Sequence, residues 1–387
     1  MPDIVIIGGG IIGAACAHEL SGRGLSVTLV ERDGLASGAS GRNQGWFVIT
    51  PDVACEPMSR LSLQVYLAAI DRSPVPVRFD RSDLGQVMFA FDDIGAETIR
   101  ERAAGYEAVG VRAERMDADD LLREEPALSQ NIAEAWFVDH GRRVDPGALT
   151  IALAQLAHEQ GAQIRRHTTV RALTTSGDRV TGVATDDGLI TADTVIVAAG
   201  PWSELLVRPL GALLPVTGER GWIVELAAPP GLLRHLVAED VEVSGGDELP
   251  TARMFAEEGS GVPEVTVGLN PMEDGTVVCG ASHHPMLRDE PEDTEAPRLI
   301  AGRAIRAVPA LGDAPVASVR WGIRPMSPDQ RPIVGWLGEG LFAATGHGGE
   351  GVILGGGTAS LVGAMLGGDA QLPFDAAPFD PARFARS

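Results

Sequence analysis

The chain has 387 residues, of which 44% are hydrophobic and 22% are charged, and its formal net charge is −22. This length favours two domains over a single core, and the composition is ordinary for a globular protein. The strong negative charge argues against nucleic acid and anionic membrane surfaces as partners, so an acidic substrate would have to be captured by specific local cations.

The cationic side chains are all arginines, because the 31 Lys+Arg positions include no lysine. Schiff-base chemistry on a lysine is therefore excluded. The three cysteines, Cys16, Cys55 and Cys279, lie far apart without a C-x-x-C pair, which argues against a disulfide framework or a metal site. The first apolar run is short and broken by glycines, so we expect no signal peptide. No segment is expected to approach the uncharged length that spans a bilayer, so we expect no membrane span and a cytoplasmic location.

The apolar run at residues 4–7 enters a glycine cluster with Gly8, Gly10 and Gly13, and a helix-forming segment follows. This Gly-x-Gly-x-x-Gly spacing between a strand and a helix predicts a dinucleotide site. The first glycine permits the turn, the second admits the pyrophosphate, and the third lets helix and strand pack closely. A second strand at 25–30 ends in Glu31, which is placed to hold a ribose hydroxyl. The fingerprint alone also permits a nicotinamide cofactor.

A small-residue loop at 32–47 ends in Trp46 and Phe47. Loops of this length are usually functional, and its hydroxyls, amides and bare backbone could wrap a pyrophosphate and reach a flat ring. Pro74-Val75-Pro76 then indicates a boundary. From 57 to 138 the patterns predict helices at 57–72, 96–109 and 118–125 and strands at 83–90 and 133–138.

Asp145-Pro146-Gly147 opens a helix expected at 148–160. Ala198-Ala199-Gly200 ends a buried strand, where small residues would let a ligand approach the backbone, although a plain structural turn is an alternative. The chain from 163 to 308 is expected to form strands at 163–170, 179–185, 190–197, 221–226, 262–268 and 276–279, and a helix at 298–308.

A strand expected at 341–344 runs into Thr345-Gly346-His347-Gly348-Gly349-Glu350-Gly351, and an apolar helix is expected at 352–366. This is a second strand–glycine loop–helix unit. A second helix N-terminus can therefore face the same ligand.

Taken together, these motifs resemble the D-amino acid oxidase superfamily, which includes glycine and sarcosine oxidases and D-amino acid dehydrogenases. The first fingerprint with Glu31 is similar to that of glutathione-reductase-type flavoproteins. The narrower resemblance rests on the loop at 36–41, Val144-Asp145-Pro146, Ala198-Ala199-Gly200, Gly322-x-Arg324-Pro325 with Pro328-Asp329, and Gly346-His347-Gly348. It spans essentially the whole chain.

The resemblance implies an α/β fold, with a glutathione-reductase-type FAD-binding Rossmann domain and a substrate domain that has a mixed or antiparallel sheet. We expect the FAD domain to comprise residues 1–76, 141–214 and 320–387, and the substrate domain 77–140 and 215–319. It also implies chemistry: a hydride leaves the α-carbon of an amine-bearing acid for flavin N5, and the imine is hydrolysed to a 2-oxo acid.

In this family Arg324 would pair bidentately with the substrate carboxylate, although a structural ion pair is an alternative role. Catalysis would then be mostly positioning, without a protein base. His347 is the second catalytic candidate, through its side chain or its backbone, and the helix that follows could stabilise negative charge on the reduced flavin. Trp46, Arg220, Arg253 and His283 are candidate substrate-pocket residues, with ordinary packing or surface roles as the alternative.

The resemblance also implies the residues that hold the cofactor. We predict non-covalent FAD, because the loop at 41–45 has no histidine and no cysteine follows Cys279. The role of Glu350 is open. The expected cofactor-binding residues are Gly8, Gly10, Ile11, Ile12, Gly13, Glu31, Arg32, Ser37, Ala39, Ser40, Arg42, Asn43, Gln44, Gly45, Val170, Ala199, Gly200, Trp202, Arg324, Gly346, His347, Gly348, Gly349, Glu350 and Gly351.

The leading hypothesis is an FAD enzyme that oxidises a D-, N-alkyl or cyclic amino acid with oxygen or another electron acceptor. One alternative is oxidation of a 2-hydroxy acid, since Arg324 would hold either substrate. Others are a flavoprotein subunit of a multi-subunit amine dehydrogenase and a nicotinamide-dependent dehydrogenase. The residues do not decide between a homo-oligomer and assembly with a partner subunit.

Overall fold

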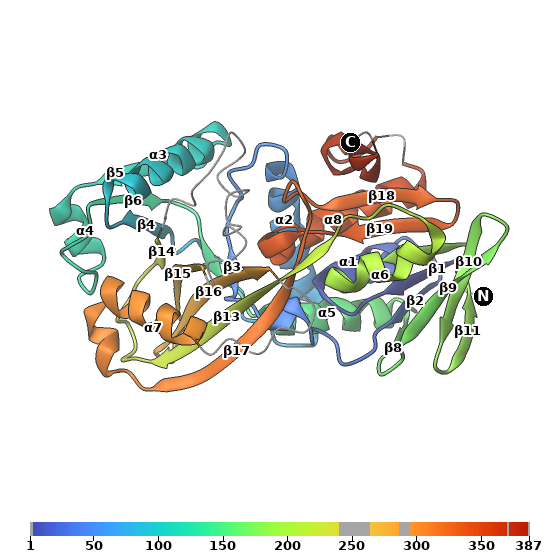
Figure 1. The fold of residues 1–387 in the computed structure, drawn as a ribbon, viewed down its shortest axis with the longest axis horizontal. Helices are drawn as coiled ribbons and strands as arrows, with labels where there is room; N and C mark the ends of the chain where they lie inside the picture. The colour runs from blue at the N-terminus through green and yellow to red at the C-terminus, as the bar shows by residue number, and fades with distance from the viewer. Residues whose placement is uncertain (1–2, 240–263, 286–294, 370, 386–387) are drawn as a thin grey trace.

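The structure is a computed structural model that describes residues 3–239, 264–285, 295–369 and 371–385. Two large β-sheets lie toward opposite ends of an elongated molecule, each with helices packed on it (Figure 1). The long antiparallel strands β13 (Thr217–Ala227) and β17 (Val316–Met326) run from the second sheet toward the first.

The first sheet has six strands in the order β18-β19-β12-β1-β2-β8, and all neighbours are parallel except β18 and β19. Its central strand β1 is an uninterrupted apolar run that is buried on both faces, as parallel strands covered by helices require. The strands are β1 (Ile4–Ile7), β2 (Val27–Val30), β8 (Gln163–Arg165), β12 (Thr194–Val197), β18 (Ile333–Gly338) and β19 (Leu341–Thr345).

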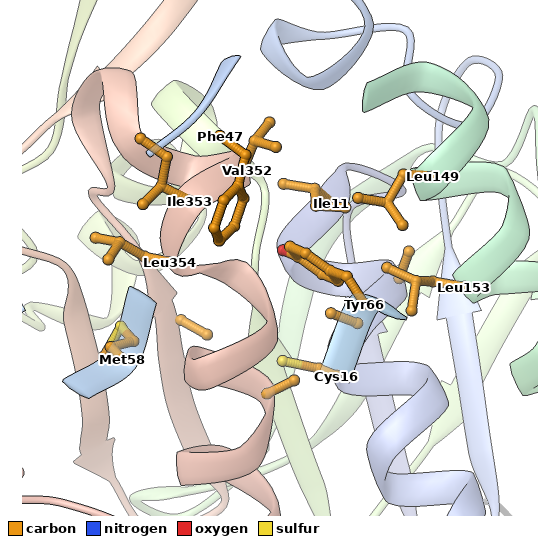
Figure 2. Close-up of a cluster of buried hydrophobic side chains, with 14 of the residues drawn as sticks. Ile11, Cys16, Phe47, Met58, Tyr66, Leu149, Leu153, Val352, Ile353 and Leu354 are labelled. Carbon is orange, nitrogen blue, oxygen red and sulfur yellow. The ribbon is translucent and has the colours of Figure 1, made fainter. Parts of the chain in front are cut away.

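Four helices pack around this sheet and against one another: α1 (Ile11–Gly22), α2 (Glu56–Arg72), α5 (Pro146–Glu159) and α8 (Gly351–Gly367). Figure 2 shows the apolar cluster where they meet, with Tyr66 of α2 among side chains of α1, α5 and α8. Helices α2 and α8 approach closely because α8 carries glycines at the contact. A Cβ atom on Gly357 would lie 2.2 Å from the carbonyl oxygen of Met58.

One helical segment of the described residues, Gly348–Gly367, is long and apolar enough by length and composition to cross a membrane. The expectation that no segment would approach this length is therefore wrong. Because 67% of its most apolar window is buried inside the protein, the segment serves as a core helix of the fold.

The second sheet has eight strands in the order β17-β13-β16-β15-β14-β4-β6-β5, and only β14 and β4 pair in parallel. Helix α7 (Glu295–Ala307) packs on β13, β15 and β16, while α3 (Asp93–Ala108) packs on β4, β5 and β6. The other elements here are β4 (Gln86–Ala90), β5 (Ala113–Met116), α4 (Ala118–Glu124), β6 (Glu134–Val138), β14 (Leu236–Glu239), β15 (Glu264–Pro271) and β16 (Thr276–Pro285).

The predicted α/β class with a Rossmann-type sheet and a mixed sheet is confirmed. Two predicted strands are wrong, because each is two strands in different sheets. Residues 163–170 divide into β8 and β9 at His167, whose φ of +56° turns the chain. Residues 190–197 divide at Ala192-Asp193, where β11 leaves β10 and β12 joins β1. Hydrophobic patterning cannot show that a chain changes sheet.

The small elements complete the fold. A three-stranded sheet contains β9 (Val170–Ser176), β10 (Arg179–Thr185) and β11 (Gly188–Thr191), and β3 (Trp46–Phe47) pairs with β7 (Arg142–Arg143). Helix α6 spans Ser203–Val207. The strands β3, β5, β7, β14, β17 and β18, and β9 beyond Val170, were not predicted from the sequence.

Candidate active site

A cavity of about 1320 Å³ extends from the β1–α1 turn to the strands β13, β16 and β17 of the second sheet. Its size exceeds that of a pocket for a single drug-sized molecule. The residues that line it come from ten segments far apart in sequence: 7–12, 30–55, 98–105, 168–170, 198–206, 219–223, 238–239, 266–268, 280–283 and 321–353.

The glycines of the first fingerprint have separate structural roles. Gly8 has φ +116°, and a Cβ atom there would lie 2.3 Å from the carbonyl oxygen of Ala198. A Cβ atom on Gly13 would lie 2.0 Å from the carbonyl oxygen of Gly8, so Gly13 serves helix–strand packing and does not line the cavity. Gly10 lines the cavity as the N-cap of α1, without a side-chain cap. The positive end of α1 therefore borders the cavity.

Glu31 is held rigidly at the end of β2. Its Oε2 accepts a hydrogen bond from Gly9 N at 2.6 Å, and its Oε1 accepts one from Asp33 N at 2.8 Å. Beside it, the Arg32 guanidinium carbon lies 3.9 Å from the ring centroid of Trp202, and both residues line the cavity. This lobe joins a fixed carboxylate to flat side chains, which suits a ribose and an aromatic base.

The loop after β2 links the two sheets. Ser40 Oγ accepts a hydrogen bond from Ile11 N at 2.9 Å. Asn43 Nδ2 donates to the carbonyl oxygens of Ala39 and Ser40. Gln44 Nε2 donates to the carbonyl oxygens of Gly268 at 2.8 Å and Gly280 at 3.2 Å, on β15 and β16. The loop is thereby fixed against the second sheet along one wall of the cavity.

His347 is 1% exposed at the turn between β19 and α8. Its Nε2 lies 2.9 Å from Thr358 Oγ1, and its Nδ1 has no hydrogen-bond partner in the described part of the chain. Burial lowers the pKa of His347 to about 3, so the ring is neutral at physiological pH. The side chain is therefore a poor proton donor, and the backbone of Gly348 and Gly349, which also line the cavity, is the better candidate for contact with a ligand.

Glu350 lines the cavity at the start of α8 and accepts a hydrogen bond from Thr50 Oγ1 at 3.1 Å. Burial raises the pKa of Glu350. The first residues of α1 and of α8 both line the cavity, so two helix N-termini border it.

Arg324 lies on β17 opposite Glu219 of β13. Its Nη1 donates to Glu219 Oε1 at 2.7 Å and to the carbonyl oxygen of Ser282 at 3.0 Å. Its Nε and Nη2 make no hydrogen bond to any residue in the described part of the chain. Arg324 thus has both an ion pair within the protein and N–H groups left for a ligand in the cavity that it lines.

Glu219 was not predicted from the sequence. It is 1% exposed and lines the cavity, and its Oε1 also lies 2.9 Å from His283 Nδ1. His283 and Trp46, two of the predicted pocket residues, line the cavity as well. Only the strand register, which the sequence does not reveal, brings Glu219 to Arg324.

The remaining predicted pocket residues do not join this group. Arg220 does not line the cavity, because side chains alternate across a strand and its neighbours Glu219 and Gly221 occupy the cavity face. Its guanidinium carbon lies 5.2 Å from the ring centroid of Trp321. Arg253 lies outside the described residues.

Twenty-two of the predicted cofactor-binding residues line the cavity, and the exceptions are Gly13, Gly45 and Gly346. Cβ atoms at these three would lie 2.0 Å from Gly8 O, 2.4 Å from Val144 O and 3.2 Å from Ile333 Cγ1, so their glycines serve packing. Sequence reasoning missed a lobe between the loop at 50–55 and α3, which includes Thr50, Cys55, Thr98 and Arg102. No motif signals these residues.

The residues present fit FAD. The cavity is large enough for a dinucleotide beside a small substrate, and the N-termini of α1 and α8 border it. The buried Nδ1 of His347 has no hydrogen-bond partner among the residues that the structure describes. Arg324 lies beside the start of α8 in the same cavity, because a Cβ atom on Gly349 would be 3.9 Å from its Cδ and Nε atoms.

Comparison with known proteins agrees with this assignment. The chain is 28% identical to the bifunctional protein ThiO/ThiG of Synechocystis sp. over 99% of its length, but it spans only 54% of that protein. It is 29% identical to hydrogen cyanide synthase subunit HcnC of Pseudomonas aeruginosa, covering 99% of this chain and 96% of the relative. The crystal structure of glycine oxidase from Geobacillus kaustophilus superposes with a TM-score of 0.83 at 25% identity, covering 99% and 98% of the two chains.

A family model described as FAD dependent oxidoreductase matches residues 3–365. The fold and the two helix N-termini at the cavity agree with this match, because all three indicate an FAD-binding protein. The chain belongs to the DAO family of FAD-dependent oxidoreductases.

Proposed function

We propose that this protein oxidises the C–N bond of a D-, N-alkyl or cyclic amino acid, giving an imine that water hydrolyses to a 2-oxo acid. The observation that carries the proposal is Arg324, whose Nε and Nη2 make no hydrogen bond to any described residue and which lines the cavity with the start of α8. The structural relative named above is a glycine oxidase, which acts on an amino acid.

When bound, FAD supplies a flavin ring that accepts a hydride. The protein's own residues contribute by positioning the substrate and the cofactor. Arg324 would hold the substrate carboxylate with a planar pair of N–H groups, which suits a carboxylate better than a single cation does. Gln44 and Asn43 would fix the loop beside the cofactor, and the α8 N-terminus would favour negative charge near Gly348 and Gly349.

The cofactor is proposed to bind without a covalent bond. Cys55 lines the cavity, but burial strongly raises the pKa of its thiol, so the nucleophilic thiolate is scarce. The ring of His347 is buried against Thr358. Release of all the flavin into the supernatant after acid precipitation is the expected result, and flavin that stays with the precipitated protein would contradict it.

The two-domain division stays a proposal, with residues 1–76, 141–214 and 320–387 binding FAD and 77–140 and 215–319 binding substrate. The boundary at 320 falls inside β17, which belongs to the eight-stranded sheet. Since the three cysteines are all buried and unpaired, we also propose a reducing, cytoplasmic location.

Assembly with a partner subunit is a further proposal, supported by the relative that is named as a synthase subunit. The native mass with and without co-purified proteins tests it. A homogeneous complex with a second chain supports it, and a protein that reduces its flavin with substrate while it is alone counts against it.

The reaction is tested by product analysis. The purified protein is supplied with D-alanine, N-methylglycine, proline enantiomers, glycolate or lactate, and with oxygen or an artificial dye as acceptor. From D-alanine or N-methylglycine we expect the 2-oxo acid and the released amine in equal amounts, and from proline the cyclic imine or its ring-opened 2-oxo acid, which keeps the amine. In each case hydrogen peroxide or reduced dye should form in the same amount as the oxidised product. Turnover of hydroxy acids alone would contradict the proposal.

A further inference from the structure

The carboxylate beside Arg324 is unusual for a site that must bind an acid. The Glu219 side chain is 2% exposed, and one of its oxygens, Oε1, lies 2.7 Å from Arg324 Nη1 and 2.9 Å from His283 Nδ1. The other oxygen, Oε2, has no hydrogen-bond partner among the residues that the structure describes. A buried carboxylate oxygen without a donor is costly, so a donor supplied by a ligand would stabilise it.

The local charges cancel before any substrate enters. Arg324 carries a positive charge, and His283 and Arg324 outweigh the opposing effect of burial to hold the pKa of Glu219 below its usual range. Burial, together with Arg324, lowers the pKa of His283, which leaves the imidazole neutral. The three side chains together are therefore a neutral group at the cavity wall.

A neutral group of this kind discriminates between ligands by their charge. A simple carboxylate anion would be attracted by Arg324 and repelled by Glu219, so it would gain little. A ligand with both a carboxylate and a protonated amine would place the first on the open N–H groups of Arg324 and offer an N–H donor to Glu219.

We propose that Glu219 is a specificity-determining residue that selects amine-bearing carboxylates over 2-hydroxy acids and other simple carboxylate anions. This inference rests on the proposed function, since it concerns the substrate class of the same site. It also explains how one arginine can serve amino acids without equally serving hydroxy acids.

The test uses two ligands that lack an α-hydrogen and so cannot be oxidised by loss of a hydride. These are 2-aminoisobutyrate and 2-hydroxyisobutyrate, which differ only in the amine and the hydroxyl. Their Kd values are measured on the holoenzyme from the change in flavin absorbance and by calorimetry. We expect the wild-type protein to bind the amine at least about tenfold more tightly.

In the Glu219→Gln variant we expect the amine to bind at least about tenfold more weakly and the hydroxy acid to bind more tightly than in the wild type. Because the two affinities are expected to change in opposite directions, the experiment distinguishes a role in specificity from a structural role. If Glu219 only held Arg324 in place, both ligands would bind more weakly. That result, unchanged Kd values, or a wild-type protein without a preference for the amine would each overturn the proposal.

The matched control is Glu134→Gln. Glu134 is also a buried carboxylate paired with an arginine, Arg100, but it lies outside the cavity. Its variant should keep the wild-type ratio of the two Kd values. Anaerobic flavin reduction of the wild type by oxidisable amines is measured in parallel, because it tests the proposed function separately. Reduction by amines with no effect of Glu219→Gln on the ratio would contradict only the specificity role.

Discussion

The guanidinium of Arg324 lies flat against the backbone at Gly221, where a Cβ atom would be 2.6 Å from both Nη1 and Nη2. No side chain larger than hydrogen fits beneath it. The arginine is thus held by Glu219 at its edge and by a glycine at its face, and its orientation is set before a ligand arrives.

Gly221→Ala should therefore displace the guanidinium without removing its charge. We expect the substrate concentration for half-maximal flavin reduction to rise about 10- to 100-fold, because an error of about 1 Å at a reacting centre has effects of this size. Stopped-flow anaerobic reduction measures it. Gly302→Ala is the control, since no atom lies within 4 Å of a Cβ atom there. If Gly221→Ala and Gly302→Ala require the same substrate concentration for half-maximal flavin reduction, the position of Arg324 is unimportant for substrate binding.

Arg324→Lys should raise the substrate concentration for half-maximal flavin reduction about tenfold, because lysine keeps the charge but loses the planar fork. Arg324→Ala loses both and should raise that concentration about a hundredfold or more. Alanine also leaves Glu219 buried without its cation, at a cost of about 3–5 kcal/mol of stability, so flavin content and Tm are recorded for each variant. Arg100→Ala, outside the cavity, is the control. If Arg324→Lys leaves the substrate dependence unchanged, Arg324 does not bind the carboxylate.

The buried ring of His347 makes the protein sensitive to acid. Its folded pKa is about 3, whereas the unfolded chain binds that proton near pH 6.5. As pH falls from about 6.5 toward 3, His347 binds a proton in the unfolded state but not in the folded state. The contribution of His347 should therefore lower the free energy of unfolding by about 1.4 kcal/mol per pH unit.

His347→Gln should remove this contribution to the pH dependence of the free energy of unfolding. Urea unfolding between pH 4 and 8 with saturating FAD measures it. His167→Asn is the control, because His167 is exposed and asparagine accepts its φ of +56°. The two variants are compared with the wild type at each pH. A slope in His347→Gln as steep as in the wild type would mean that the ring is protonated in the folded protein.

Glu350 should act in the opposite direction. Its folded pKa is raised, so above about pH 4.5 the unfolded state loses a proton that the folded state keeps. Stability from this group falls as pH rises toward the folded pKa. Glu350→Gln should gain stability relative to the wild type between pH 5 and 8, whereas exposed Glu97→Gln should not. If the stability difference between Glu350→Gln and the wild type is constant across this range, the pKa of Glu350 is not raised in the folded protein.

The sequence was most informative where a local backbone requirement chose the residue. Gly13 is a glycine because it contacts Gly8 within one strand–turn–helix unit, and Gly8 has a positive φ at the turn of that unit. The spacing of a few residues reveals both, although the sequence does not show that Ala198 also packs against Gly8. Arg324 was found only through the family resemblance. Glu219 and Gly221 were missed, since their roles come from the pairing of β13 with β17, about a hundred residues apart in sequence.

The dependence on long-range packing also explains the other residues whose positions were predicted wrongly or missed. Arg220 was a candidate pocket residue with a packing or surface role as the alternative, and strand alternation turns it away from the cavity. Thr98 and Arg102 on α3 reach the cavity only because the second sheet places that helix beside the loop at 50–55. Such residues carry no signal of their own in a single sequence.

The central claim is that the cavity oxidises an amine-bearing acid, and anaerobic bleaching of the bound flavin tests it most directly. Purified holoenzyme is mixed without oxygen with N-methylglycine, D-alanine, proline, glycolate and lactate, and the visible absorbance is followed. We expect at least one amine to bleach the flavin completely and faster than either hydroxy acid. A flavin that stays oxidised with every amine, or is bleached only by hydroxy acids, would contradict the account.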